Sequence, residues 1–537
     1  MKKISVIKPQ YPQIFGGLGF HNTEALLYPV TEQEHFRQIL CKCYREMAPG
    51  FMRAFGGYDD WSKESMDAFY EYYSQMQKVT DTPIYLAGGR GKLHFSEEEM
   101  EAYCRRVADN LMYLKKEKGM KHLRYYCFSN EMSQVVWGAL LKDLPLFKRY
   151  HEMLYRAFQN RDLDIGLLAT DASEYKGWET IDWAIGNMNK ITEDYCAHIY
   201  ERHHGLDDLA FYDFFYGKCN EMVKKTLAAD GKRFILGEFG VQKSEHLLYG
   251  NGAVVDACHY FNDPVECAKS GIMLAEMVFS AINAGVFALA FWSYADLPDP
   301  YSCAYSEKEG YAKAWGECEK YIAGGTTDVR YNKWGMLRWE DNGDYSAREI
   351  YWCLAPMVKL FKRNAKVLEI LAEDPLLRAC GVINRDGSVS VGIVNRHTDP
   401  CPITLDSALF RQNIRVYEYD CLHVPVNDFA DIQDFTVLNK DDPAITLPPL
   451  SVTFFTTDYK EKAKTVAAKG LKKKGDRLVW KEVKDPNHCY YRVYAHPNAN
   501  FVPSRENQIA STVATDLPIT DKKLKYKVLS VDQWGNV

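Results

Sequence analysis

Long hydrophobic segments are missing from this sequence. The longest uninterrupted apolar run, residues 286–292, is far shorter than the roughly 18 residues that a helix needs to cross a bilayer. The first eight residues are basic, but their apolar stretch ends after a few positions, whereas a secretion signal contains roughly 7–15 consecutive apolar residues. We therefore expect a cytoplasmic protein with no membrane partner.

Paired cysteines and an excess of positive charge are also missing. The 15 cysteines include no Cys-x-x-Cys pair, which indicates reduced, mostly buried thiols in place of a disulfide framework. The 66 Lys+Arg and 72 Asp+Glu residues give a net charge of -6, so we expect no nucleic-acid partner. The composition leaves the oligomeric state open.

Motifs for cofactors, metals and a serine nucleophile are absent as well. Residues 16–19 lack the third glycine of a dinucleotide-binding site, and residues 88–92 precede Leu93, where a phosphate-binding loop needs Ser or Thr. His203 and His204 are adjacent, and no His-Glu-x-x-His motif occurs, which argues against zinc. There is no Gly-x-Ser-x-Gly elbow. We expect no cofactor and no metal.

The first two thirds of the chain alternate between helical and strand patterns. Capping boxes at residues 31–34 and 96–99 precede apolar residues at helical spacing. The candidate buried strands are residues 51–55, 84–87, 123–128, 165–169, 195–200, 234–236 and 286–292. An opening strand near residues 4–7 or 13–17 would make eight. This alternation predicts an α/β fold with a (β/α)8 barrel over residues 1–366, with an open doubly wound sheet as the alternative.

After residue 366 the helical period disappears. Short strand patterns at residues 389–394, 414–419 and 451–455 predict a β-sandwich domain over 367–459. Residues 460–474 are rich in lysine and alanine and are interpreted as an exposed linker. The strand patterns of residues 476–537 resemble those of a fibronectin type III module.

Two predicted barrel strands end in a carboxylate. Asn130-Glu131 follows the fourth strand, and Glu238 follows the seventh. In a barrel of this kind chemistry occurs at the C-terminal ends of the strands. Two carboxyl groups about 5–5.5 Å apart are what a retaining glycosidase needs. The alternative for each glutamate alone is a solvated or ion-paired side chain.

The Asn-Glu pair after strand four and the Glu after strand seven resemble the signature of clan A, the 4/7 superfamily of retaining glycoside hydrolases. The resemblance covers residues 1–366 and is nearest to families 39 and 5. It implies that Glu131 is the acid/base, that Glu238 is the nucleophile and that Asn130 binds the 2-hydroxyl of the sugar.

The same resemblance implies roles for four other strand-end residues. Arg53 would lie near the nucleophile, His198 and Tyr200 would lie on one side of strand six with the tyrosine orienting the nucleophile, and Trp292 would stack on the sugar. The alternatives are a structural salt bridge, a core histidine and a core tryptophan.

Loops after the first two strands supply further candidates. His21, Asp59 and Trp61 are predicted to line the subsite for the non-reducing sugar, with a plain surface role as the alternative. Tyr294 and Asp296, after the last strand, are weaker candidates.

Together these features predict a retaining glycoside hydrolase that acts by double displacement on a β-linked, or stereochemically equivalent, oligosaccharide or glycoconjugate, in exo mode. The alternatives are a non-catalytic carbohydrate-binding barrel and a transglycosidase that uses the same two carboxylates. The sugar and the linkage are left open.

Overall fold

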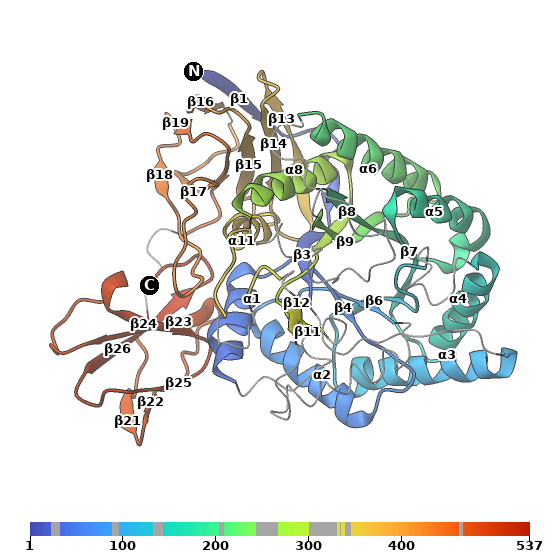
Figure 1. Ribbon diagram of the computed structural model, residues 1–537, viewed down its shortest axis with the longest axis horizontal. Coiled ribbons are helices and arrows are strands. Elements are labelled where there is room, and N and C mark those ends of the chain that lie inside the picture. Colours follow the sequence, from blue (N-terminus) through green and yellow to red (C-terminus); the bar gives the residue numbers. More distant parts are fainter. Residues whose placement is uncertain are drawn as a thin grey trace.

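The computed structural model of the protein describes residues 1–22, 33–88, 96–132, 143–202, 209–242, 267–299, 330–332, 335–338, 345–406, 408–460 and 466–537. Figure 1 shows a barrel of strands ringed by helices, a larger β-sheet packed beside it, and a small C-terminal β module, drawn in red, below that sheet.

The barrel is closed by eight parallel strands in the order β10-β3-β4-β5-β6-β7-β8-β9. Their bounds are β3 Gly17–His21, β4 Phe51–Phe55, β5 Ile84–Ala87, β6 Leu123–Cys127, β7 Gly166–Ser173, β8 Asp194–Arg202, β9 Phe234–Gln242 and β10 Ala288–Phe291. The predicted (β/α)8 barrel is confirmed, and each of the seven candidate strands contributes to it.

The opening strand was predicted wrongly. Strand β1 (Lys2–Ile7) pairs with strands of the second sheet, and β2 (Ile14–Phe15) pairs there as well. The barrel instead begins at β3, whose residue Gly19 lies so close to β4 that an added Cβ would stand 1.6 Å from the Phe51 carbonyl oxygen. Glycine is needed for this contact but weakens the strand pattern in the sequence, so β3 was not recognised.

Helices surround the barrel. They are η2 Phe36–Leu40, α1 Cys41–Met47, α2 Lys63–Met76, α3 Glu97–Met112, α4 Leu144–Gln159, α5 Glu174–Met188, α6 Phe211–Ala228, α8 Ala268–Ala284 and α11 Tyr351–Leu360. Short helical turns are η3 Gln77–Val79, η4 Tyr113–Glu117, η5 Asn189–Ile191 and η6 Arg505–Asn507. The capping box of Ser96 and Glu99 is confirmed at the start of α3. Residues 31 and 32 of the other predicted box lie outside the described residues.

The second sheet has the strand order β18-β17-β20-β15-β14-β13-β1-β16-β19. Its remaining strands are β13 Ala365–Ala372, β14 Leu377–Ile383, β15 Val389–Asn395, β16 Cys401–Asp406, β17 Ile414–Asp420, β18 Thr436–Leu438, β19 Ala444–Leu447 and β20 Ser451–Thr456. These strands enclose an apolar core of their own that includes Ile4, Val391 and Phe455. Helix α8 packs against β14 and β15 and joins this sheet to the barrel.

The C-terminal module consists of two three-stranded sheets, β21-β22-β25 and β24-β23-β26. The bounds are β21 Lys472–Lys474, β22 Arg477–Val479, β23 His488–His496, β24 Gln508–Thr512, β25 Asp516–Pro518 and β26 Lys525–Asp532. Residues 472–474 were expected in a linker and instead form β21. A further strand pair, β11 Leu297–Asp299 and β12 Arg330–Asn332, follows the barrel. The resemblance to fibronectin type III stays a prediction.

Each cysteine that the structure describes is a free thiol. Within the described residues, no helix has the length and hydrophobicity of a membrane span.

A buried ionic cluster joins all three parts of the chain. Lys42 of α1 lies 2.8 Å from Glu46 Oε2 and 2.7 Å from Asp431 Oδ1, and all three side chains are almost fully buried. Asp431, in the loop after β17, also pairs with Arg492 and Arg505 of the C-terminal module at 3.0 and 2.9 Å. Buried charges need such partners, so this cluster fixes how the parts dock.

Asp431→Ala would leave Lys42 and Arg492 as buried cations without their shared partner. We expect the free energy of unfolding to fall by about 3–5 kcal/mol, the range for breaking a buried ion pair, as measured by urea denaturation at pH 7. The control Glu482→Ala breaks the exposed pair with Lys78, which also joins the barrel to the C-terminal module. It should change the free energy by less than about 1 kcal/mol. Equal losses in both variants would contradict this account of the docking.

Candidate active site

The two carboxylates predicted at the strand ends meet at the C-terminal end of the barrel. Glu131 follows β6 and Glu238 lies in β9, and one oxygen of each lies within 4.8 Å of the other. Both also approach the same ring atom, since His198 Nδ1 lies 3.3 Å from Glu131 Oε1 and 3.5 Å from Glu238 Oε2. The side chain of Glu131 is 15% exposed and that of Glu238 only 5%. The carboxylate pair therefore converges on one small region with unequal access to solvent.

Arg53, in the middle of β4, is the buried cation beside this pair. Its Nη1 donates to Glu238 Oε1, and its Nη2 donates to Asn130 Oδ1 at 2.6 Å and to Asp171 Oδ2 at 2.7 Å. Burial by itself would lower the pKa of Arg53, but Asp171 and Glu238 hold it well above its ordinary value. The guanidinium is therefore permanently charged and fixes three acceptors from three strand ends.

Glu238 is held from several sides. Tyr200, two residues after His198 on β8, donates its hydroxyl to Glu238 Oε2. Burial raises the pKa of Glu238, while His198 and Arg53 act to lower it and Glu131 raises it further. The net direction is upward, because burial outweighs the two cations.

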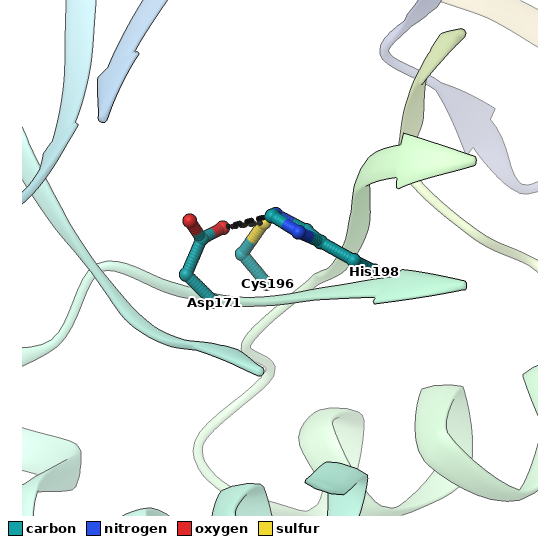
Figure 2. A group of neighbouring side chains, drawn as sticks. All are labelled: Asp171, Cys196 and His198. Carbon is teal, nitrogen blue, oxygen red and sulfur yellow. Dashed lines mark hydrogen bonds and ion pairs between the residues drawn. The ribbon is translucent and has the colours of Figure 1, made fainter. Parts of the chain in front are cut away.

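His198 rests on an aspartate that sequence reasoning missed. His198 Nε2 lies 2.8 Å from Asp171 Oδ1, and the Cys196 thiol donates to the same oxygen at 3.2 Å. Figure 2 shows Asp171, Cys196 and His198 together, with the dashed line joining the aspartate to the imidazole. Burial alone would lower the pKa of His198, but Asp171 and then Glu238 raise it to about 10. The imidazole is therefore a cation at neutral pH.

Local irregularities in the barrel place these groups. The pairing of β7 with β8 shifts between Thr170 and Ala172, directly at Asp171, and the pairing of β8 with β9 shifts between Ala197 and His198. Such bulges redirect side chains and are common beside active sites. Asp171 also has a φ of 57° and Glu131 a φ of 47°, in the left-handed region that non-glycine residues rarely adopt.

The signal for Asp171 was present in the sequence. The candidate strand at 165–169 continues in the structure to Ser173, so Asp171 lies at a strand end like the other predicted residues. Carrying the strand four residues further would have placed it among the candidates.

Two groups of residues have the donor types and spacing of a metal site: Asp171, Cys196 and His198, and Glu131, His198 and Glu238. The chemistry of the donors disfavours a metal. Asp171 already accepts from the Arg53 guanidinium, and burial raises the pKa of the Cys196 thiol, whereas the thiolate is the form that binds metals. A charged imidazole is likewise not a ligand. These groups form an ion-pair network instead.

His21 and Trp292 lie beside this network. His21 Nδ1 is 2.9 Å from Arg53 Nη1 and 4.0 Å from Glu238 Oε1. Its ring centroid lies 4.3 Å from that of Trp292 and 4.6 Å from that of Phe55. Trp292 is 8% exposed, so it presents only a small part of its surface. His21 thus packs beside the carboxylates, in contact with both Arg53 and Trp292.

Asp59 and Trp61 have partners outside the ion-pair network. Asp59 pairs with Arg106 of α3 at 2.6 Å, and Trp61 packs on Phe69 of α2 with ring centroids 5.1 Å apart. Trp61 also lies close to Gly56, directly after β4, where an added Cβ would stand 2.6 Å from Trp61 Cη2. That Asp59 and Trp61 line the subsite for the non-reducing sugar stays a prediction.

The weaker candidates after the last barrel strand have structural partners. Asp296 accepts two hydrogen bonds from Arg348, at 2.6 and 2.7 Å, with both side chains fully buried. The Tyr294 hydroxyl donates to the Leu40 carbonyl. These contacts anchor the segment that follows the barrel.

No protein-family model matches this chain, and no curated protein matches it. Solved structures do. The catalytic domain of the family 30 xylanase C from Talaromyces cellulolyticus has a TM-score of 0.57 at 13% identity, over 85% of this chain and 99% of that one. The fold is that of TIM-barrel glycoside hydrolases with an attached β domain.

Two further structures show the same fold. The family 51 α-L-arabinofuranosidase AbfB from Bifidobacterium longum has a TM-score of 0.56 at 13% identity, over 84% of this chain and 99% of that one. The endo-β1,6-glucanase BT3312 has a TM-score of 0.56 at 12% identity, over 85% of this chain and 94% of that one. Families 30 and 51 thus share this fold, and the likeness to families 39 and 5 stays a prediction.

Arg53→Met would remove the cation shared by Asp171 and Glu238. We expect a loss of about 3–5 kcal/mol in the free energy of unfolding at pH 8. The loss should be smaller at pH 5. Arg53 acts to lower the pKa of Glu238, so its removal should raise that already raised pKa further, and such a group destabilises the fold only where the pH is high enough to ionise it. Urea denaturation at both pH values measures the difference.

Arg106→Met is the matched control, because it removes an arginine from an exposed pair with Asp59. We expect a change below about 1 kcal/mol at either pH. A pH-independent loss in Arg53→Met would show that the arginine acts only through packing.

Proposed function

We propose that this protein is a retaining glycoside hydrolase. The observation that supports the proposal most is the approach of the Glu131 and Glu238 carboxylates, with one oxygen of each within 4.8 Å of the other. Retaining enzymes have carboxyl groups about 5–5.5 Å apart, whereas inverting enzymes leave about 6.5–9.5 Å for a water molecule. The short separation favours double displacement.

Glu238 is the proposed nucleophile. It is the more buried of the two carboxylates and is fixed by Arg53 and by the Tyr200 hydroxyl, which leaves it in one orientation for attack on the anomeric carbon. Bond formation between a Glu238 oxygen and that carbon would displace the glycosidic oxygen and give a covalent glycosyl-enzyme.

Glu131 is the proposed acid/base. Its side chain is the more exposed of the pair, which suits a group that must reach the leaving group and later a water molecule. It would give its proton to the departing oxygen in the first step. In the second it would take a proton from water as the water oxygen attacks the anomeric carbon and releases Glu238.

Asn130 is the proposed partner of the sugar's 2-hydroxyl. Its Oδ1 accepts from Arg53 Nη2 at 2.6 Å, so the amide orientation is set and Nδ2 is left as a donor. Trp292 is the proposed apolar contact for the pyranose or furanose ring.

The activities of the structural neighbours support a proposal for the substrate class. A xylanase, an α-L-arabinofuranosidase and an endo-β1,6-glucanase share the fold. We propose a β-linked or stereochemically equivalent glycoside as the substrate. Exo action, and a cytoplasmic site that meets imported oligosaccharides or glycoconjugates, remain predictions from the sequence.

Glu238→Ala should abolish turnover, because no other carboxylate of the cluster is free to attack. Glu131→Ala should reduce kcat by on the order of 10²–10⁴ for poor leaving groups. The loss should be much smaller for a dinitrophenol, which departs without protonation. Release of phenols from a panel of aryl xylosides, arabinofuranosides and glucosides measures both effects. Glu482→Ala, in the C-terminal module, is the control. Ordinary activity in Glu238→Ala would contradict the assignment of the nucleophile.

The first sugar product should keep the anomeric configuration of the substrate, because two displacements restore it. Proton NMR of the anomeric signal during the first minutes of turnover measures this. Inverted product would overturn the proposal. Transfer to an added sugar acceptor in preference to water would identify a transglycosidase. A rise in melting temperature with the sugar, without any release of phenol, would identify a non-catalytic binding barrel.

A further inference from the structure

The imidazole of His198 occupies a central position between the two proposed catalytic carboxylates. Its Nδ1 lies 3.3 Å from Glu131 Oε1 and 3.5 Å from Glu238 Oε2, so the two acceptors are almost equally distant. On the other side of the ring, Nε2 lies 2.8 Å from Asp171 Oδ1. The ring thus links the Asp171 carboxylate, at Nε2, to the two proposed catalytic carboxylates, at Nδ1.

Asp171 contacts neither Glu131 nor Glu238 and can act on them only through other groups. Its Oδ2 accepts from Arg53 Nη2 at 2.7 Å, and its Oδ1 accepts from Cys196 as well as facing His198. Gly237 allows β9 to pass close to this group, because an added Cβ would stand 2.5 Å from Cys196 Sγ and 3.3 Å from His198 Nε2. Asp171 is therefore tightly enclosed and its position is fixed.

The buried charges of the cluster cancel only under one condition. Arg53 and His198 supply two positive charges and Asp171 one negative charge, and all three side chains are fully buried. One negative charge on the carboxylate pair makes the total neutral. Buried net charge is strongly unfavourable, so the cluster is matched to a pair that carries a single proton.

Double displacement keeps a single negative charge on the carboxylate pair and moves it from one carboxylate to the other. Before attack, Glu238 is ionised and Glu131 holds the proton. In the glycosyl-enzyme, Glu238 is a neutral ester and Glu131 is ionised, because its proton has left with the aglycone. The negative charge thus moves from one neighbour of His198 Nδ1 to the other.

We propose that Asp171 is a positioning residue that keeps His198 charged and holds its Nδ1–H between Glu131 and Glu238, so that one hydrogen bond stabilises whichever carboxylate is ionised. This inference rests on the proposed glycosidase function.

The electrostatic surroundings of His198 agree with this role. Burial acts to lower the pKa of His198, Asp171 and Glu238 raise it, and Arg53 lowers it. Glu131 faces Nδ1, and the Cys196 thiol shares the Asp171 oxygen. Asp171 is the largest of the favourable influences, so its charge decides the protonation of the ring.

Asp171→Asn tests the proposal, because it keeps the shape and one acceptor oxygen but removes the charge. We expect the alkaline limb of the pH profile of kcat/KM to move to lower pH by about one unit or more. Above the shifted limb, activity should fall about tenfold for each further pH unit. At pH 7, kcat should fall, but by less than the roughly 10²–10³-fold loss seen when an entire hydrogen-bond donor is removed. KM should change little, since Asp171 does not reach the substrate.

Cys196→Ala is the matched control. It removes the other side chain that donates to Asp171 Oδ1 and leaves every charge in place. We expect the position of the alkaline limb to be unchanged. A limb that moves equally in both variants would show that packing, and not the charge of Asp171, sets it, and would overturn the proposal.

Nitrogen-15 NMR of the histidine rings gives a readout that needs no substrate. His198 is assigned as the signal lost in His198→Asn. In the wild type both ring nitrogens should remain protonated up to at least pH 8, and in Asp171→Asn one should lose its proton at lower pH. A neutral His198 in the wild type at pH 7 would overturn the proposal even if Asp171→Asn failed to fold. If the wild type cleaved no glycoside, the proposed function would fall, while this measurement would still decide whether Asp171 keeps the imidazole charged.

Discussion

A guanidinium that is enclosed in a protein needs acceptors in place of water, and both terminal nitrogens of Arg53 find them at the top of the barrel. Its terminal nitrogens contact Glu238, Asp171 and Asn130, which come from the ends of three different strands. Displacing any one of them would leave a buried charge or donor unpaired. The positions of the carboxylates are therefore mutually dependent, and the arrangement of the site follows from where this one cation lies.

The barrel strands adapt to that requirement. The pairing irregularities at Asp171 and His198 break the regular alternation of β7 and β8 where a side chain has to face the cluster. Gly237 then lets β9 approach closely enough for Glu238 to reach both Arg53 and Tyr200.

The second sheet is attached to the outside of the barrel by the same kind of contact. Lys42 of α1 meets Asp431, and Glu276 of α8 pairs with Arg396 at 2.6 Å with both side chains buried. Both barrel partners are on outer helices. Buried ion pairs are directional and require matched partners, so they specify how this sheet docks on the barrel.

Much of the fold and part of the site could be read from the sequence, because local patterns encode them. Seven barrel strands have apolar runs of their own. Parallel strands bring their C-terminal ends to one side of a barrel, so the convergence of Glu131 and Glu238 could be predicted without coordinates. The resemblance to clan A added Arg53, His198 and Tyr200. What could not be predicted depends on pairing between distant residues. Strand β1 joins the second sheet because Ile4 pairs with Ala372, more than three hundred residues away, and β3 is held by a close backbone contact that favours glycine over strand-forming residues.

Asp59 is a plausible site residue in the sequence, but the folded chain places Arg106 beside it. The charge on His198 is likewise a tertiary property, because an imidazole has a pKa near neutrality until burial and its neighbours act on it, and the neighbour that decides the outcome, Asp171, is brought there only by the closure of the barrel.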